Sequence, residues 1–567
     1  MLEHRVKNQF MKKVFAFIVF ILFTNLVFSN QSLPDDVTFW SDYPNEILAK
    51  TIVDRMTPEE LYSQILMFGW AGAEPDNLLY QWVNRGLGSV KVFGWNTDDI
   101  KLVAKSITSL QKTSARGRFK IPLFVATDQE GGWIRHVKGE TANTPGNMAI
   151  GASGYPVDAW YAAYYINKEI KALGINMNFA PTVDLFTDHE STIIGTRSFG
   201  ENPEYSGILG AAFSAGSIAA GVIPTAKHFP GHGDTSLDSH GALPIIDIDY
   251  KTLKERELVP FEYLIKQKIP AIMSGHLSLP KIDTTGAPAS LSKHILTDIL
   301  RNQLHYEGLI ITDDMMMNGA TLYAGSLSNA FKMAVEAGND IVISSTTARL
   351  NESLWTSNLN LIKTDKVFEA RVREAAYRVI KAKLEYFKGD NPAPLHPNPN
   401  TISQFIPDKE GQKFFLEQAC RSITLYKQTN FPVKAENAGK VLLAGALPRF
   451  FSEGKKRYPN SSEFRFSYEL GPNETEWMCN NILKSINGYD TIIICVSNER
   501  SARIASMLKD CGKRVIVFSI MSPVNSFDLD WADEILLGYS YSGYTFVALY
   551  AALNGEFTVK GSMPFTR

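Results

Sequence analysis

Short apolar runs recur along most of this sequence, and each is followed by polar residues and then by a longer stretch with helical character. Their spacing of roughly 30 to 55 residues is typical of strand–helix units that build a parallel sheet. Polar residues at the carboxyl ends of these strands favour a (β/α)8 barrel, because that face carries the active site of the fold. An open doubly wound sheet is the alternative. The seven runs are residues 89–93, 122–127, 177–180, 222–226, 271–273, 309–312 and 341–343.

A closed barrel needs eight strands, so an irregular segment must supply the eighth. We expect a TIM-type (β/α)8 barrel over residues 36–390. Ahead of the first run, Thr57 and Glu60 form a capping-box pattern with Pro58 at the first helical position. This pattern predicts a helix whose apolar face is formed by Leu61, Ile65 and Leu66.

A proline-rich segment divides the chain. Residues 391–399 hold four prolines, a composition typical of a stiff, extended linker rather than a helix or a central strand. We place the linker at 391–411 and a smaller α/β domain, of the open-sheet, sandwich type, at 412–567. This domain shows no glycine motif for nucleotide binding. Its predicted strands are residues 441–444, 491–496, 515–520 and 534–537, with helices at 502–508 and 544–553.

The overall charge excludes some classes of partner. Lys and Arg number 57 against 59 Asp and Glu, so no net field attracts nucleic acid or an anionic membrane. With 45% hydrophobic residues, the 567-residue chain has the composition of a folded globular protein. The four cysteines show no metal-ligand or redox spacing, and disulfide pairing among them is left open. Specificity must therefore come from a local site.

The first thirty residues have the layout of a secretory signal peptide. Two lysines precede an apolar stretch at residues 14–23, and Val27 and Ser29 occupy the −3 and −1 positions of a cleavage site. We predict removal of residues 1–29 and a periplasmic or extracellular protein, with envelope association as one option. An uncleaved N-terminal anchor is the alternative, and no other membrane contact is predicted.

The densest group of chemically active residues lies at 227–240, where three of the ten histidines fall within thirteen residues. An even spread would place roughly 0.2 histidine in such a window. Lys227 and His228 end a predicted strand and so lie at the barrel mouth, whereas Asp238 and His240 belong to the glycine-rich loop that follows. A carboxylate two residues from an imidazole fixes its tautomer and favours its protonated form, which suits a general acid/base.

Two other interpretations of this loop stay open. Its three histidines and Asp234 are competent metal ligands, but their spacing lacks the helical turn of zinc-binding motifs. The loop could instead be structural and pinned by local hydrogen bonds, which is the favoured interpretation for His232 alone. We expect no metal ion and no cofactor.

Three further segments carry polar residues at predicted strand ends. Asp313 and Asp314 follow one apolar run, and adjacent side chains leave a strand in opposite directions. One carboxylate can therefore face the site while the other caps the next helix. Asp128 ends an earlier run and is followed by glycines that let a ligand approach the backbone. Arg197 offers a planar donor for hydroxyl or carboxylate groups.

These motifs together resemble the family 3 glycoside hydrolases, in the β-N-acetylglucosaminidase branch. The matching segments are residues 128–132, 195–200, 227–240 and 312–315, which occur in the family's order and span the predicted barrel. The loop at 227–240 resembles this branch specifically, because the β-glucosidase branch generally takes its acid/base carboxylate from the second domain. The second domain and the ending at 561–565 resemble those of longer, two-domain members.

The resemblance implies roles for individual residues. Asp313 matches the catalytic nucleophile, and Asp238 with His240 matches the general acid/base dyad. The implied mechanism is a retaining double displacement through a covalent glycosyl-aspartate. Protonated His240 assists departure of the aglycone, and neutral His240 then activates water. The residues that match sugar-hydroxyl ligands are Asp128, Arg197, Lys227 and His228, with His276 as an additional candidate.

Two positions depart from the family pattern. Gln129 stands where many relatives carry His, and Trp133 stands where a basic or polar residue is frequent. These changes are expected to alter the neighbouring subsite. The second domain carries no residue that the resemblance assigns to the site.

The predicted function is the exo-acting hydrolysis of terminal non-reducing N-acetylglucosamine from peptidoglycan fragments or chitooligosaccharides. The carbohydrate is the only expected partner, and nucleic acid is not expected to bind. The alternatives are an N-acetylglucosaminide phosphorylase, since a neutral imidazole base repels phosphate less than a carboxylate does, and another family 3 β-glycosidase such as a β-glucosidase. Two further alternatives are a metal-dependent hydrolase and a non-catalytic sugar-binding protein of the envelope.

Overall fold

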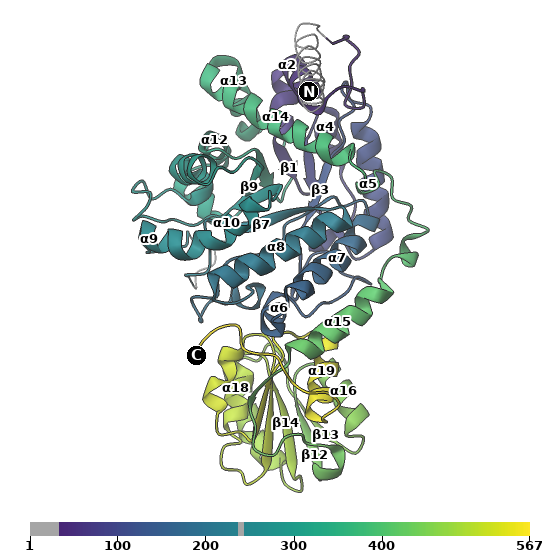
Figure 1. The fold of residues 1–567 in the computed structure, drawn as a ribbon, viewed down its shortest axis with the longest axis vertical. Helices are drawn as coiled ribbons and strands as arrows, with labels where there is room; N and C mark the ends of the chain where they lie inside the picture. The colour runs from purple at the N-terminus through teal and green to yellow at the C-terminus, as the bar shows by residue number, and fades with distance from the viewer. Residues whose placement is uncertain (1–32, 236–242) are drawn as a thin grey trace, which may run out of the picture.

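The computed structural model describes residues 33–235 and 243–567. The predicted signal peptide at 1–29 and the predicted dyad of Asp238 and His240 lie outside the described residues. Figure 1 shows a larger and a smaller part, with α15 (Lys409–Ser422) at their junction. In the described part of the chain, no helix is long and apolar enough to cross a membrane.

The larger part is a closed barrel of eight parallel strands, which confirms the predicted (β/α)8 class. Strand β1 closes the barrel because it pairs with both β10 and β2. In spatial order the strands are β1 (Leu66–Phe68), β10 (Ile341–Ser344), β9 (Leu309–Asp314), β8 (Ala271–Ser274), β7 (Ile223–Phe229), β6 (Met177–Asn178), β3 (Phe124–Thr127) and β2 (Ser89–Lys91).

The eighth strand, β1, lies partly in a segment that the sequence pattern assigned to a helix. The capping box at Thr57 is present, and α3 (Pro58–Gln64) begins as predicted. The helix ends before Ile65, so Leu66 opens a strand and its predicted helical position is wrong. All three residues of β1 are buried, and a short buried strand shows the same apolar character as a buried helix face.

Helices surround the barrel, and two that are far apart in sequence pack against each other. Helix α14 (Lys366–Phe387) packs against α2 (Asn45–Arg55) on the outside of the barrel (Figure 1). The other covering helices are α4 (Asn77–Asn84), α5 (Ile100–Ser114), α6 (Asn147–Ser153), α7 (Pro156–Ala172), α8 (Pro203–Ala220), α9 (Tyr250–Thr252), α10 (Leu258–Lys266), α11 (Asn318–Ala324), α12 (Leu327–Ala337) and α13 (Ser353–Thr364), with π-helical segments at Leu253–Glu257 and His294–Gln303. A small hairpin, β4 (Gln129–Gly131) and β5 (Ile134–Arg135), follows β3.

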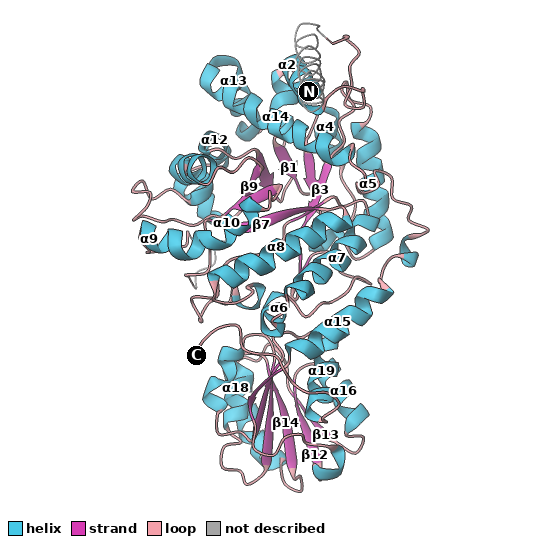
Figure 2. Cartoon of the chain, in the orientation of Figure 1, coloured by secondary structure: helices cyan, strands magenta, loops and turns pink. Residues whose placement is uncertain are grey.

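The smaller part is a six-stranded sheet in which only β11 runs antiparallel. Figure 2 shows the sheet with α18 on one side and α16 and α19 on the other. The four predicted strands are present as β12, β14, β15 and β16, whereas the sequence pattern missed β11 and β13 at the two edges. All four cysteines are free thiols. The bounds are β11 (Thr424–Lys427), β12 (Val441–Gly445), β13 (Ser462–Arg465), β14 (Thr491–Val496), β15 (Arg514–Ser519), β16 (Glu534–Leu537), α16 (Pro448–Arg457), α17 (Pro472–Ser485), α18 (Glu499–Ser506) and α19 (Gly543–Leu553).

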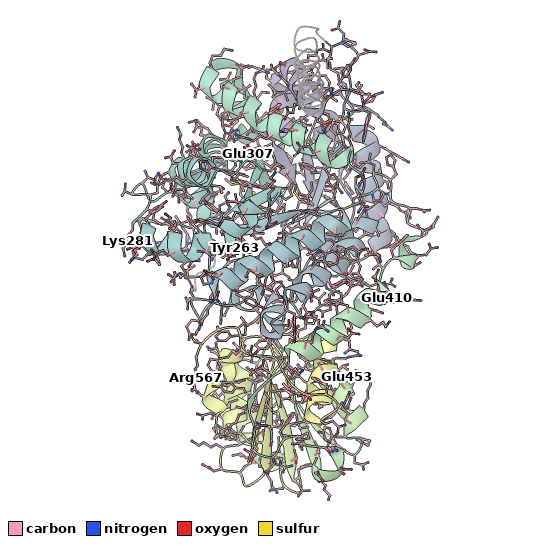
Figure 3. The ribbon with its side chains drawn as sticks, viewed as in Figure 1. Tyr263, Lys281, Glu307, Glu410, Glu453 and Arg567 are labelled. Atoms are coloured by element: carbon pink, nitrogen blue, oxygen red, sulfur yellow. The ribbon has the colours of Figure 1, made fainter. Side chains whose placement is uncertain are left out.

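The last residues of the chain return to the barrel. The Ser562 amide donates to Ala152 O at 3.0 Å, and the Thr566 amide donates to Glu201 Oε1 at 2.9 Å. Arg567 follows beside the second domain, as Figure 3 shows. The smaller part is therefore attached to the barrel both at α15 and at this C-terminal tail.

Candidate active site

The described residues of the predicted site converge at the carboxyl end of the barrel strands. Asp128 directly follows β3, Lys227 and His228 lie near the end of β7, and Asp313 lies near the end of β9. Arg197 ends a short 3-10 helix in the long connection between β6 and α8. This is the face of a (β/α)8 barrel on which active sites are built.

Lys227 stands between two carboxylates at the floor of the mouth. Its Nζ lies 2.5 Å from Asp128 Oδ1 and 2.6 Å from Glu130 Oε1. Burial acts to lower the pKa of Lys227, but the two carboxylates outweigh burial and raise it. Burial acts in the opposite sense on Asp128, whose pKa is nevertheless held well below its usual range by Lys227 and Lys91. These groups are therefore charged at neutral pH.

Arg197 is engaged within the protein through a two-point contact with Glu130. Its Nε donates to Glu130 Oε2 at 3.0 Å and its Nη2 to Oε1 at 2.7 Å, the geometry in which a guanidinium matches a carboxylate best. Despite burial, Arg197 and Lys227 lower the pKa of Glu130 to about 2. The same Nη2 lies 3.5 Å from His228 Nε2, so Arg197 also borders the site.

His228 is oriented by a buried carboxylate behind it. Its Nδ1 lies 2.6 Å from Asp184 Oδ2, and its backbone amide donates to Asp184 Oδ1 at 3.0 Å. Burial acts to raise the pKa of Asp184, but His228 outweighs burial and the pKa falls to about 2. With Nδ1 directed at this carboxylate, Nε2 faces the site and lies 4.0 Å from Asp313 Oδ2.

Within residues 33–235 and 243–567, the side chain of Asp313 accepts one hydrogen bond, from a backbone amide. Its Oδ1 accepts from the Asp314 amide at 2.7 Å, and its side chain is 18% exposed. Burial acts to raise the pKa of Asp313, but His228, His276 and Lys91 outweigh it and lower the pKa to about 2. Asp313 is thus ionised at neutral pH and remains partly accessible, which are the properties of a nucleophile.

Asp314 braces the turn after β9 and does not cap a helix, contrary to the sequence expectation. Its Oδ1 accepts from the Met316 amide at 3.0 Å and from the Ser345 amide at 2.9 Å. Helix α11 begins later, with Met317 before it and no side-chain cap. One of the adjacent carboxylates, Asp313, therefore faces the site while Asp314 is structural. The structural role of Asp314 is to accept backbone amides of the turn and of Ser345, and not to cap a helix.

His276 lies beside the nucleophile candidate but is engaged on both ring nitrogens. Its Nδ1 is 2.7 Å from Ser290 Oγ, and its Nε2 is 3.0 Å from Asp314 O. The side chain is fully buried, and burial lowers the pKa of the ring. His276 therefore supports the backbone next to Asp313 and presents no free ring nitrogen to a sugar hydroxyl.

The described start of the 227–240 loop is anchored by two hydrogen bonds to side chains outside it. The His232 amide donates to Asp184 Oδ1 at 2.7 Å, and Arg256 Nη2 donates to Asp234 Oδ2 at 2.8 Å. Within residues 33–235 and 243–567, no three His, Cys, Asp or Glu side chains are grouped to hold a metal ion. The described members of the alternative metal set, His228, His232 and Asp234, are thus not assembled as ligands.

Several charged residues of the mouth were not named as site residues from the sequence. Lys91, Glu130 and Asp184 contact the predicted residues directly, and His136 Nδ1 lies 3.6 Å from Asp128 Oδ2. Burial lowers the pKa of His136 to about 4. Their positions in the sequence could have identified two of them as site residues, because Lys91 ends β2 and Glu130 lies two residues beyond Asp128.

A cavity lies at the other end of the barrel. It has a volume of about 780 Å³ and is lined by the residues before β7, β8 and β9, including Glu307, which Figure 3 labels. None of the predicted site residues that the structure describes lines this cavity. The charged mouth is therefore identified as the candidate active site by its side chains and not by the volume of a cavity.

Comparison with known proteins adds to this geometry. Residues 63–382 match the family described as "Glycosyl hydrolase family 3 N terminal domain". "Beta-hexosaminidase A" of Pseudoalteromonas piscicida is 31% identical over 391 residues, which are 59% of this chain and 65% of that protein. "Beta-hexosaminidase" of Pseudomonas aeruginosa (strain LESB58) is 35% identical over 221 residues, 39% of this chain and 65% of that protein.

A solved structure covers both parts of the chain. It is the "glycoside hydrolase family 3 beta-N-acetylglucosaminidase from Paenibacillus sp. str. FPU-7", with a TM-score of 0.81, 26% identity and coverage of 90% of this chain and 99% of that one. The chain spans 65% of the length of the two curated relatives, slightly less than two thirds.

Proposed function

The chain belongs to glycosyl hydrolase family 3, and we propose that it is a retaining, exo-acting β-N-acetylglucosaminidase. The proposed reaction releases terminal non-reducing N-acetylglucosamine from peptidoglycan fragments or chitooligosaccharides. The names of the curated relatives and of the Paenibacillus enzyme support an aminosugar substrate. The geometry of the barrel mouth supports glycoside hydrolysis.

The observation that carries this proposal is the state of Asp313. It is a mostly buried carboxylate, ionised at neutral pH, at the carboxyl end of β9 and 4.0 Å from His228 Nε2. A carboxylate in this state can attack an anomeric carbon and form a covalent glycosyl-enzyme. The nearby imidazole and the Lys91 ammonium offset the charge that would otherwise make a buried carboxylate unfavourable.

The sugar ring would be held by the charged groups around Asp313. Asp128 accepts hydroxyl hydrogens, and His228, with Nδ1 turned to Asp184, offers Nε2 to the site. Lys227 fixes Asp128 from below. Because all these groups are fixed by further ion pairs, little reorganisation is needed as charge develops on the ring.

The second catalytic group is assigned from the sequence alone. In the proposed cycle protonated His240, paired with Asp238, donates its proton to the leaving oxygen as the C1–O bond breaks and the Asp313–C1 bond forms. Neutral His240 then accepts a proton from water, which attacks C1 and releases Asp313. The sugar leaves with its original anomeric configuration.

Hydrolysis of 4-nitrophenyl N-acetyl-β-glucosaminide tests the proposal. We expect Asp313→Ala and His240→Ala to lower kcat by roughly 1000-fold or more. The exposed surface pair of His294 and Asp298 provides matched controls, since each is about half exposed and distant in sequence from the loop. His294→Ala and Asp298→Ala should retain wild-type rates. Equal rates in all four variants would overturn the assignment.

Two competing activities are separated by product analysis. The acid/base imidazole assigned from the sequence is compatible with phosphate as the acceptor, so the reaction is run in phosphate buffer and followed by mass spectrometry. We expect free N-acetylglucosamine, and a sugar 1-phosphate would show a phosphorylase. Faster turnover of 4-nitrophenyl β-glucoside than of the aminosugar glycoside would show a β-glucosidase.

Export is proposed on the N-terminal sequence alone. Two lysines before an apolar stretch and small residues at the −3 and −1 positions predict cleavage after Ser29. N-terminal sequencing of the protein purified from its native host should begin at Asn30. A start at Met1 or Met11 in the mature protein would contradict this proposal.

A further inference from the structure

A buried lysine ends strand β2 at the barrel mouth. The Lys91 side chain is only 6% exposed, although an isolated ammonium is costly to remove from water. Its neighbours in the strand, Ser89 and Val90, are buried as well. A lysine in this position needs a partner inside the protein, and the identity of that partner indicates its role.

The partner is Asp128. Lys91 Nζ lies 2.9 Å from Asp128 Oδ2, and it also lies over the rings of Phe93 and Phe179, at 4.3 and 5.1 Å from their centroids. The ammonium is thus enclosed by one carboxylate and two aromatic faces, both of which stabilise a cation. The side chain is held in one place with its ammonium next to Asp128 Oδ2, and the same charge helps to lower the pKa of Asp313.

Asp128 is consequently held from both sides. Lys227 Nζ donates a hydrogen bond to Oδ1, whereas Lys91 Nζ forms an ion pair with Oδ2, and His136 Nδ1 lies 3.6 Å from the same oxygen. An ionised carboxylate has about four lone-pair sites, so acceptor capacity remains for a ligand. Two lysines on different strands, β2 and β7, also fix the plane of the carboxylate.

We propose that Lys91 is a positioning residue for sugar recognition, which acts through Asp128 by fixing its second oxygen toward the substrate hydroxyls. The inference rests on the proposed function, because it assigns Lys91 to the binding of the sugar. Lys91 is not a catalytic residue in this role. Its removal leaves Asp128 charged through Lys227, with the Lys227 hydrogen bond and the His136 contact in place but without the ion pair at Oδ2.

A second buried lysine offers a matched control. Lys383 of α14 is fully buried, and its Nζ donates to Gly88 O at 2.7 Å and to Gln64 Oε1 at 3.0 Å. Gly88 precedes β2 and Lys91 ends it, a separation of roughly 10 Å along the strand. The two lysines therefore share burial and neighbourhood, but only Lys91 contacts a carboxylate of the mouth.

The test compares Lys91→Met and Lys91→Gln with Lys383→Met on 4-nitrophenyl N-acetyl-β-glucosaminide, after circular dichroism has shown that each variant is folded. We expect both Lys91 variants to lower kcat/KM by roughly 10- to 100-fold, mostly through KM, because a charge-assisted contact that orients a ligand is lost. Lys383→Met should stay within about threefold of wild type. Equal losses at the two lysines would overturn the proposal.

A double-mutant cycle shows whether Lys91 acts through Asp128. In an Asp128→Asn background, Lys91→Met should change kcat/KM by less than about twofold, because the carboxylate that it orients is gone. A full additional loss in that background would overturn the proposal.

The same series separates failure of this inference from failure of the proposed function. A wild type that turns over the aryl β-glucoside and not the aminosugar glycoside overturns the proposed function, and the variants are then compared on the glucoside with the same expected pattern. A wild type inactive on both overturns the two together.

Discussion

Buried charge gathers at both ends of the barrel, and the two clusters use their carboxylates differently. At the amino end Asp340, which precedes β10, contacts three arginines: Arg301 at 2.5 Å, Arg371 at 3.0 Å and Arg378 at 3.3 Å. The Ile310 amide donates to it as well, at 3.0 Å. Both oxygens of Asp340 are therefore occupied by protein groups.

At the mouth, the carboxylate of Asp313 has fewer contacts with the described residues. Its Oδ1 accepts one backbone amide, and His228 Nε2 lies 4.0 Å from its Oδ2. Both carboxylates have lowered pKa values. The oxygens of Asp340 are fully hydrogen-bonded, whereas Asp313 is stabilised mainly by nearby charge. The comparison teaches that burial and charge alone do not identify a site, whereas unused acceptor positions on an ionised group do.

The largest expected effect is on activity at the mouth. Asp313→Asn should lower kcat by roughly 1000- to 100,000-fold, since the nucleophile is lost while the shape is kept. The free energy of unfolding in urea should fall by no more than about 2–3 kcal/mol, because the lowered pKa of Asp313 shows that the folded protein stabilises its charge. A loss of stability larger than that of Asp340→Asn would break the contrast with Asp340.

Asp340→Asn should show the reverse pattern. Leaving three arginines without their shared carboxylate is expected to lower the free energy of unfolding by about 3–5 kcal/mol. The kcat of the folded enzyme should stay near wild type. Glu374→Gln, which removes a half-exposed partner of Arg378, is the control and should cost less than about 1 kcal/mol. A large fall in kcat with unchanged stability would contradict the structural role of this cluster.

Glu257, beside the base of the 227–240 loop, provides an intermediate effect that depends on pH. Burial raises its pKa to about 7, although Arg256 Nε lies 2.6 Å from Oε1. Because the folded state holds this proton more tightly than the unfolded state, the stabilisation is complete below about pH 4.5 and is lost as pH rises through 7. Glu257→Gln should therefore gain stability over wild type at pH 8 and none at pH 4.

Thermal unfolding at the two pH values measures this difference. Glu255→Gln, on the exposed face of the same segment, serves as the control and should follow wild type at both. A gain in stability from Glu257→Gln that is independent of pH would show that packing, and not the proton, sets the stability at this position.

The smallest expected effect is that of a chelator. In the described part of the chain, no three His, Cys, Asp or Glu side chains are grouped to hold a metal ion. Dialysis against EDTA should change kcat by less than about twofold. A loss of activity restored by added Zn²⁺ would instead support the metal-dependent alternative.

Sequence patterns located most of the barrel because each strand is apolar and ends in polar residues. They missed β1 because it follows α3 after a single residue, Ile65, with no turn signal between them. They missed β13 because its side chains are partly exposed at a sheet edge, where polar residues are common. A pattern of apolar runs therefore does not detect a short strand that has no turn residues before it, or an edge strand that is rich in polar residues.

The site was predicted in part for a related reason. Strand ends indicated where side chains such as Asp313 and Lys227 would meet. The positions of the strand ends do not indicate which of these side chains form pairs. The two-point contact of Arg197 with Glu130 and the engagement of both ring nitrogens of His276 were not foreseen. Such pairing depends on the positions of several strands at once, which the chain order alone does not specify.

The attachment of the smaller part at two points has a mechanical consequence. The polypeptide enters that part through α15 and leaves it through residues 561–566, whose amides are bonded back to the barrel at Ala152 and Glu201. A load applied at Arg567, for instance when the enzyme is tethered to a surface by its last residue, would be carried first by these few hydrogen bonds. The six-stranded sheet would bear tension only after the tail had been peeled away.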